Sequence, residues 1–371
     1  FNRFVPDATN TAGPTPGYSG VDLVTRDLFD PDFFNDTLFT GIETITGYLE
    51  GAYELDILGN AEVYVELLAN QRKSRASSGR QLALDYLVGS PLVPLQFRND
   101  VFLGAGTEQS GFQPVAARAF IYRGQAETTT EVDFMRLAGG LRGDFFVDNW
   151  RYDLYASKAY NDGEINFQDQ VITSRVVNSV NVVPDGSGGF ACATNADPNC
   201  VAAPALTPAV IGGDLPQDYL DYITADDVGI TKFRETIISG VIDGPLFALP
   251  GGDAQLALGA EFRRNSINDQ PSQFSQNGQL LGFSSAASTV GKDSVYEGFG
   301  EIFLPLLANV PFAETLNVSA SGRYTDYDSY GDDWTYKVAG EWSPFDFIGF
   351  RASYGTSFRA PSLAEQFQGA T

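Results

Sequence analysis

Apolar and polar side chains alternate with a period of two over long stretches of this chain. Between residues 61 and 72, Val63 and Val65 occupy one register while Glu62 and Glu66 occupy the other. Further stretches with the same alternation are residues 134–145, 254–264, 316–325, 334–342 and 348–359. Because successive side chains of a β-strand point to opposite faces, each stretch predicts a strand with one apolar and one polar face.

Three features favour a membrane barrel over a soluble β-sandwich, whose strands also have one apolar face. The alternating segments run for roughly 12–15 residues, against about 5–6 in a typical soluble strand. Their apolar registers are rich in Gly and Ala and carry no charge between the first and last apolar residue. Trp150, Trp334 and Trp342 lie on the apolar register near strand ends, where an aromatic girdle belongs. No run of 18 or more apolar residues predicts a membrane-spanning helix. The predicted fold is all-β, a transmembrane antiparallel β-barrel.

Connections of two lengths indicate the orientation of the predicted strands. Short turns lie at residues 58–60, 147–149, 250–252 and 343–346, and long irregular stretches lie at about 75–115, 162–228 and 269–291. Barrels of this kind have short periplasmic turns and long extracellular loops. We count about ten strands in one barrel domain, the first running downward from near Gly41, with one unusually short extracellular return at Asp328–Asp332. Within the longest loop, residues 171–183 could form a helix or a strand, and residues 216–228 have helical spacing.

Composition narrows the possible chemistry. The 371 residues have a formal net charge of −24 and include no His. Without His, neither a Ser-His-Asp triad nor a His-based zinc site can be built from these residues, so we expect no enzyme, no catalytic residue, no metal site and no cofactor. The acidic excess argues against nucleic acid as a partner. The start at Phe1 and the stop at Thr371, directly after a predicted strand and loop, suggest missing sequence at both ends.

Cys192 and Cys200 lie eight residues apart in the longest loop, across a turn of Asn, Asp and Pro. This spacing allows a disulfide bond, which suits an oxidising extracellular compartment. A cluster of four aspartates could offer oxygen ligands to calcium, but its spacing does not match a calcium loop and a solvated turn is the better interpretation. These residues are Asp326, Asp328, Asp332 and Asp333.

Charged side chains on the polar registers near the C-terminus are candidates for the lumen of the barrel. A pair of carboxylates on one strand face could serve acid–base catalysis, but mixed charges that line a barrel interior are the favoured interpretation. These candidates are Glu297, Glu301, Arg323, Arg351 and Arg359.

The segment YGTSFRAPSLAEQF, residues 354–367, resembles the strand-and-loop signature of TonB-dependent receptors. The matching residues are Phe358, Arg359, Ala360, Pro361, Ser362 and Glu365. Four further segments, ALGAEFRRNS, VYEGFGEIFLPLL, SASGRYTDYDSYG and TYKVAGEWSPF, resemble barrel strands of the same family in the same order, as does GLRGDFFVDNWRYDLY.

This resemblance implies a bacterial outer-membrane receptor with a 22-stranded barrel, of which the chain supplies about ten strands and no plug domain. The implied partners are the outer-membrane lipid, a scarce ligand, and the TonB complex of the inner membrane, contacted through a region outside this chain. The expected ligand is a ferric siderophore, an oligosaccharide or a cobalamin-like molecule. The alternative is a passive, porin-like channel.

Overall fold

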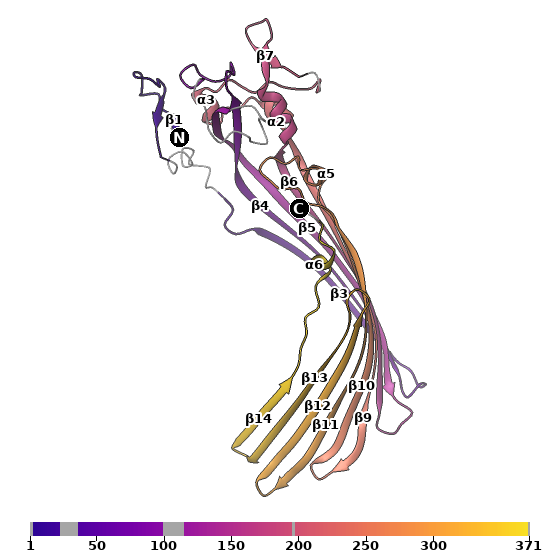
Figure 1. Cartoon of the computed structure of the whole chain (residues 1–371). Coiled ribbons are helices and arrows are strands. Elements are labelled where there is room, and N and C mark those ends of the chain that lie inside the picture. Colours follow the sequence, from indigo (N-terminus) through magenta and orange to yellow (C-terminus); the bar gives the residue numbers. More distant parts are fainter. Residues whose placement is uncertain (1–2, 23–35, 99–114, 195–196, 370–371) are drawn as a thin grey trace.

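The computed structural model describes residues 3–22, 36–98, 115–194 and 197–369. Ten strands form one antiparallel sheet in the order β14-β13-β12-β11-β10-β9-β6-β5-β4-β3 (Figure 1). Their bounds are β3 Gly41–Glu54, β4 Glu62–Leu87, β5 Val115–Asp144, β6 Arg151–Val171, β9 Thr224–Leu249, β10 Gly252–Gln270, β11 Thr289–Val310, β12 Ala313–Tyr327, β13 Gly331–Phe345 and β14 Ile348–Gly355. This confirms the predicted antiparallel barrel sheet of about ten strands. The sheet is not closed, and the edge strands β3 and β14 have no second strand partner among the described residues.

The connections differ between the two ends of the sheet, as predicted. At one end the strands are joined by short turns at residues 55–61, 145–150, 250–251, 311–312 and 346–347. At the other end the connections at residues 88–114, 172–223 and 271–288 are long, and only that at residues 328–330 is short. Figure 1 shows the short turns and the long connections at opposite ends of the strands.

The turn between β3 and β4 explains the sequence Leu58-Gly59-Asn60. All three residues have positive φ angles of 55, 74 and 50°. A Cβ atom on Gly59 would lie 1.9 Å from the backbone oxygen of Asp144, so a side chain cannot be accommodated there. The Asp144 amide donates a hydrogen bond of 2.7 Å to the Gly59 carbonyl, which fixes this turn against the end of β5.

Backbone pairing brings the apolar registers of the strands onto one face of the sheet. Leu67 lies opposite Leu137, and farther along the sheet Leu258 lies opposite Ile242. We call the face that carries these side chains the outer face and the opposite one the inner face. Their neighbours on the outer face are Val65, Gly139, Leu141, Leu154, Gly240, Ala320 and Val338.

Trp334 and Trp342 mark the two limits of the apolar band on β13, where both belong to the outer-face register. The eight residue steps from Trp334 to Trp342 span about 27 Å along the strand, which is about 21 Å along the barrel axis for strands tilted by about 40°. This height is close to the apolar band of about 25 Å on outer-membrane barrels. No helix in the described part of the chain is long and apolar enough to cross a membrane.

The strands β4, β5 and β9 have 26, 30 and 26 residues, which is longer than the alternating pattern predicts. Their extensions lie toward the long connections and carry polar side chains on both registers, as in Thr128, Thr129 and Thr130. Pairing continues there because the hydrogen-bond ladder uses backbone groups only. The loops therefore begin later and end earlier than the stretches 75–115, 162–228 and 269–291 suggested.

Residues 88–98, 172–194 and 197–223 pack together beyond the strand ends into a unit that we call the cap (Figure 1). Its elements are α2 Thr173–Val180, β7 Val182–Pro184, β8 Phe190–Cys192, α3 Pro208–Ile211 and α4 Gln217–Ile223. The ambiguous stretch 171–183 thus contains a helix followed by a short strand, and the helical spacing after residue 216 corresponds to α4. The apolar core of the cap includes the fully buried Leu82, Leu84, Tyr86, Ile121, Val176 and Ile223.

Three further elements lie outside the large sheet and the cap. A hairpin of β1 Phe4–Pro6 and β2 Tyr18–Gly20, which the sequence pattern did not predict, meets the cap through Phe97. The centroids of the Tyr18 and Phe97 rings lie 5.2 Å apart. Helix α5 Gln273–Gln276 lies in the connection after β10, and helix α6 Leu363–Phe367 follows β14.

Candidate functional site

Charged side chains on the inner face form ion pairs across neighbouring strands. Glu297 of β11 accepts hydrogen bonds from Arg323 Nη1 at 3.0 Å and from Thr325 Oγ1 at 2.9 Å, both on β12. The Glu297 side chain is only 7% exposed, and the Arg323 guanidinium also lies 4.7 Å from the centre of the Phe299 ring. Arg323 therefore compensates the charge of a carboxylate that has lost most of its contact with water.

Each of the remaining lumen candidates occupies a distinct position. Arg351 of β14 pairs with Glu341 of β13 at 2.8 Å. Glu301 lies on the inner face of β11 with an exposed side chain, opposite Ala257 and Ser321. The structure thus brings Glu297 together with Arg323, whereas Arg351 has a partner that the sequence reading did not single out.

Two further ion pairs on the inner face, between β4 and β5, were not predicted from the sequence. Arg142 bonds Glu62, and Arg136 lies 3.6 Å from Glu66. All four residues stand on the polar registers read from the sequence, but they belong to β4 and β5. The connection between these strands is long, so no tight turn fixes their register and the pairing could not be read from spacing alone.

A shallow hollow of about 330 Å³ lies on the inner face across β11 to β14. Its polar lining consists of Asn317, Ser319, Lys337, Glu341, Arg351 and Ser353. Uncharged hydrogen-bonding groups alternate there with charges of both signs. Such a surface can solvate a polar solute or hold a polar protein segment.

The segment after β14 that resembles the family signature is held together by local hydrogen bonds and an ion pair. Ser362 accepts a hydrogen bond from the Glu365 amide, and the Glu365 carboxylate accepts one from the Ser362 amide at 2.7 Å, which makes a capping box at the start of α6. Arg359, which lies outside any strand, donates a hydrogen bond of 2.5 Å to Glu365. The Ser362 amide first, and then Arg359, lower the pKa of Glu365.

Helix α6 reaches back to β11. A Cβ atom on Gly291 would lie 2.0 Å from the Phe367 ring, so the absence of a side chain at Gly291 lets this ring rest on the strand. Phe358 meets the Tyr327 ring edge-on, with the centroids 6.2 Å apart. Packing and capping therefore account for the residues of this segment that resemble the family signature.

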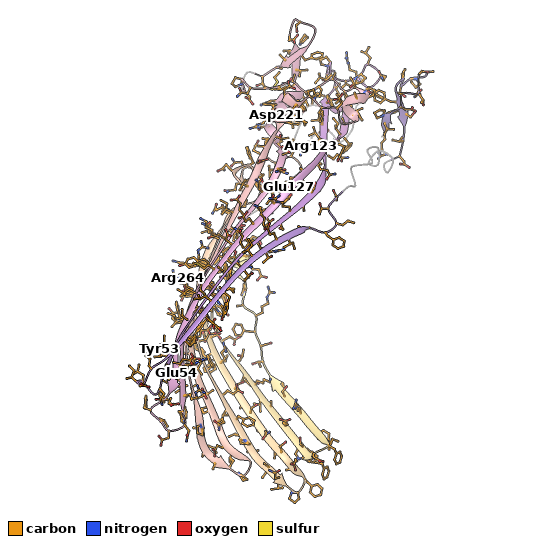
Figure 2. All side chains as sticks on the ribbon, turned by 180° about the vertical axis from the view of Figure 1, so that it is seen from behind. Tyr53, Glu54, Arg123, Glu127, Asp221 and Arg264 are labelled. Carbon is orange, nitrogen blue, oxygen red and sulfur yellow. A yellow bond between two sulfur atoms is a disulfide. The ribbon has the colours of Figure 1, made fainter. Side chains whose placement is uncertain are left out.

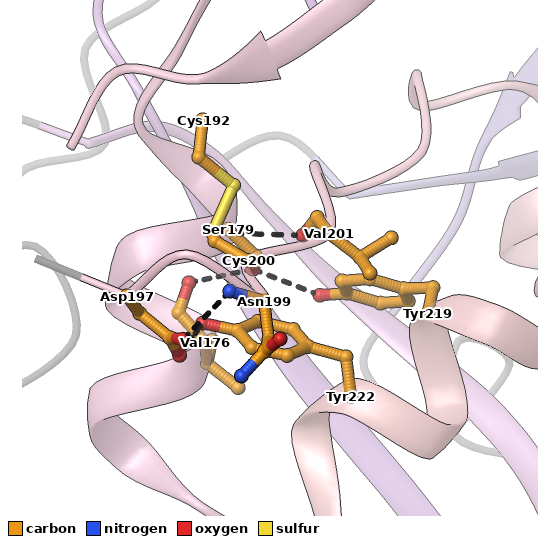
Figure 3. The surroundings of a disulfide bond; sticks show 9 residues. All are labelled: Val176, Ser179, Cys192, Asp197, Asn199, Cys200, Val201, Tyr219 and Tyr222. Carbon is orange, nitrogen blue, oxygen red and sulfur yellow. Dashed lines mark hydrogen bonds between the residues drawn. A yellow bond between two sulfur atoms is a disulfide. The ribbon is translucent and has the colours of Figure 1, made fainter. Parts of the chain in front are cut away.

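The cap is held together by covalent and polar contacts (Figure 3). Cys192 and Cys200 are joined by a disulfide bond, with their Cα atoms 6.2 Å apart. The Tyr222 hydroxyl donates a hydrogen bond of 3.0 Å to Asp197, which lies inside the disulfide loop. The buried Tyr219 hydroxyl lies 3.3 Å from Ser179 Oγ, and burial raises the pKa of Tyr219. Helices α2 and α4 are thus tied to the loop that carries the disulfide.

A buried ion pair anchors the base of the cap. Asp85 of β4 is fully buried and accepts two hydrogen bonds from Arg118 of β5, from Nε at 2.5 Å and from Nη2 at 2.8 Å. This bidentate geometry satisfies both carboxylate oxygens. This pair could not be predicted from the sequence, because its two residues belong to different strands on either side of a long connection.

The described residues contain no group of three or more His, Cys, Asp or Glu side chains placed to hold a metal ion. The aspartates between residues 326 and 333 lie in and beside the short return between β12 and β13, where the Tyr324 and Trp334 rings contact each other at a tilt of 47° with centroids 5.0 Å apart.

Comparison with known proteins identifies the family of this barrel sheet. A family model described as TonB dependent receptor-like, beta-barrel matches residues 70–371. No match was found among curated proteins. The match covers most of the chain, including nine of the ten sheet strands at least in part and the capping segment after β14. The chain belongs to the TonB-dependent receptor family, whose members are non-enzymatic transporters of the bacterial outer membrane.

Proposed function

We propose that this chain forms the ligand-receiving mouth and part of the lumen wall of a receptor that captures a scarce ligand and imports it with energy supplied through TonB. The expected ligand classes are ferric siderophores, oligosaccharides and cobalamin-like molecules. The observation that carries the proposal is the rigid cap, with its own apolar core and disulfide, at the end of the sheet where the long connections gather. A rigid mouth loses little conformational entropy when it binds a ligand, which favours high affinity.

The inner face supplies the second element of the proposal. We infer that Glu297, Glu301, Arg323 and Arg351 line the lumen, where mixed charges suit contact with a polar plug. Arg359 stabilises the loop that follows β14, because its ion pair with Glu365 fixes the start of α6. The disulfide between Cys192 and Cys200 keeps the cap in one shape.

The test compares growth of a deletion strain with that of the complemented strain on single iron sources and single carbon sources. We expect one nutrient class to require the receptor at low concentration, and its uptake to stop when TonB is deleted or a protonophore is added. Uptake that continues without TonB would favour the passive channel instead. A variant that lacks residues 185–199 should bind the ligand more weakly while still assembling in the outer membrane.

A further inference from the structure

Positive side chains gather on the outer face just beyond the apolar band of β6, β9, β10 and β11. On β10 the apolar register ends at Phe262, and the next outer-face residue is Arg264, which is exposed and labelled in Figure 2. Arg264 lies opposite Thr236 of β9 and Ser294 of β11. The following row contains Arg234, Ser266 and Lys292. We call the set Lys158, Lys232, Arg234, Arg264 and Lys292 the cationic patch.

Charge is separated between the two faces at this level of the sheet. The outer-face register from residue 230 to 236, from 264 to 270 and from 290 to 294 holds Lys232, Arg234, Arg264 and Lys292 and no carboxylate. On the inner face, the same three segments contain Glu235, Asp269 and Asp293. In a chain with a net charge of −24, this concentration of positive charge on one face is unusual.

Most of the patch lacks an ionic partner. Arg234 pairs with Asp162 of β6 at 2.6 Å. Among the described residues, no carboxylate lies within 4.0 Å of the charged nitrogens of Lys232, Arg264 or Lys292, and all three side chains are exposed. Five arginines of the inner face, by contrast, pair with carboxylates on their own or adjacent strands, as Arg323 does with Glu297. Acidic side chains on the outer face border the patch on β6, where Asp162 lies opposite Lys232, and on β12, where Asp326 lies opposite Tyr296.

The patch lies directly above aromatic side chains. Phe262 and Tyr296 stand side by side on the outer face, with ring centroids 5.1 Å apart. Tyr160 lies within the patch, directly opposite Arg234, and its ring centroid is 5.8 Å from Lys158 Nζ and 5.2 Å from the Arg234 guanidinium. The patch on β10 and β11 begins two to four residues beyond these rings, which is about 5–10 Å along a barrel axis for tilted strands. Aromatic girdles lie at the level of the lipid headgroups, so the cations reach the charged part of the headgroup layer.

We propose that the cationic patch binds the phosphate groups of the anionic glycolipid in the outer leaflet. The long connections place this end of the strands on the extracellular side of the outer membrane. Arginine and lysine are the side chains that bind phosphate most strongly, and the hydroxyls of Thr236, Ser266 and Ser294 stand between them. The acyl chains of the same lipid would lie against Leu258, Ile238 and the other apolar side chains below.

A phosphorylated lipid fits this surface better than a free anion does. The patch is open and shallow, without the buried donors of an anion pocket, and it is continuous with the apolar outer face below it. A molecule that carries phosphate and acyl chains would contact both surfaces at once, whereas inorganic phosphate would contact only exposed cations. Attraction between juxtamembrane cations and anionic headgroups adds for each charge near the surface.

The test uses the full receptor, purified in mild detergent and studied by native mass spectrometry with bisphosphorylated lipid A as the probe. The neutralised variant Lys232→Gln/Arg264→Gln/Lys292→Gln should bind this lipid at least tenfold more weakly than the wild type. The matched control Lys232→Arg/Arg264→Lys/Lys292→Arg keeps every charge and should bind within threefold of the wild type. Resistance of all three receptors to unfolding in detergent shows whether the barrel is intact.

Two further ligands distinguish the sources of phosphate. Dephosphorylated lipid A should bind to the wild type at least tenfold more weakly than bisphosphorylated lipid A does. It should bind to the wild type and to the neutralised variant with equal affinity. Inorganic phosphate at millimolar concentration should not displace bound lipid. Equal binding of bisphosphorylated lipid A by folded wild-type and neutralised receptors would overturn the proposal, as would displacement by free phosphate or equal affinity for the two lipids.

Discussion

Arginine introduced at the centre of the outer face of β13 should strongly destabilise the barrel. Val338 lies four residues from Trp334 and four from Trp342, and 46% of its surface is exposed. Its direct neighbours on adjacent strands are Ala320 and Tyr354, so no acidic partner stands opposite it. A residue so placed lies about 10 Å from either aromatic limit of the band, close to the bilayer midplane. The variant Val338→Arg should therefore lose about 2–4 kcal/mol of folding free energy, because a lipid-facing charge at this depth costs that amount.

The adjacent residue provides a matched control. Ala339 has the same depth but faces the inner side, between Ser319 and Ser353 and near Glu341. The variant Ala339→Arg should cost less than about 1 kcal/mol, because its guanidinium enters a polar surface. The assay is denaturant unfolding of the receptor folded in lipid vesicles, followed by tryptophan fluorescence, in which a lower midpoint at unchanged slope reports lost stability. Equal losses for the two variants would refute the assignment of the faces.

Three further predictions concern the cap. Reduction of the bond between Cys192 and Cys200 should lower local cap stability by about 2–3 kcal/mol, seen as faster amide exchange in α2 and α4 with unchanged exchange in the sheet. Asp85→Leu should lower the stability of the cap by about 3 kcal/mol and make it sensitive to proteolysis, because the charge of Arg118 is left without its partner. The double variant Asp85→Leu/Arg118→Met should recover most of that loss. Burial raises the pKa of Tyr219 above the usual 10.0, so cap stability should be independent of this group below pH 10 and fall above it. Tyr219→Phe should reduce that alkaline loss, measured by tyrosinate absorbance and cap proteolysis, and an unchanged profile would contradict the assignment.

The membrane-spanning part of the sheet was predictable because each strand has one face toward lipid and the other toward the polar lumen. Val63 and Glu62 report opposite faces directly, and Trp334 and Trp342 mark the apolar band. The lengths of the connections between the strands predicted the strand number and the two ends of the sheet. The turn at Gly59 could also be predicted from the sequence, because a position without room for a side chain requires glycine.

Features that depend on pairing between distant segments were not predictable in the same way. Beyond the apolar band the strands continue through segments such as residues 128–130, in which both registers are polar and alternation gives no signal. The buried contact of Leu82 with the cap core, the Asp85–Arg118 pair and the β1–β2 hairpin all join segments separated by long connections. The cationic patch is an intermediate case: the sequence shows Arg264 just past Phe262, but only the register places it beside Arg234 and Lys292.

The central claim is that side chains of one register meet hydrocarbon, and a spin-label scan along β13 tests it most directly. Single cysteines from residue 334 to 342 in the reconstituted receptor would each carry a nitroxide, and collision rates with oxygen and with a water-soluble nickel complex would be compared. We predict a period of two, with high oxygen and low nickel accessibility at Val338 and the reverse at Ala339. Uniform accessibility along the strand, or oxygen maxima at the odd-numbered residues, would contradict the account.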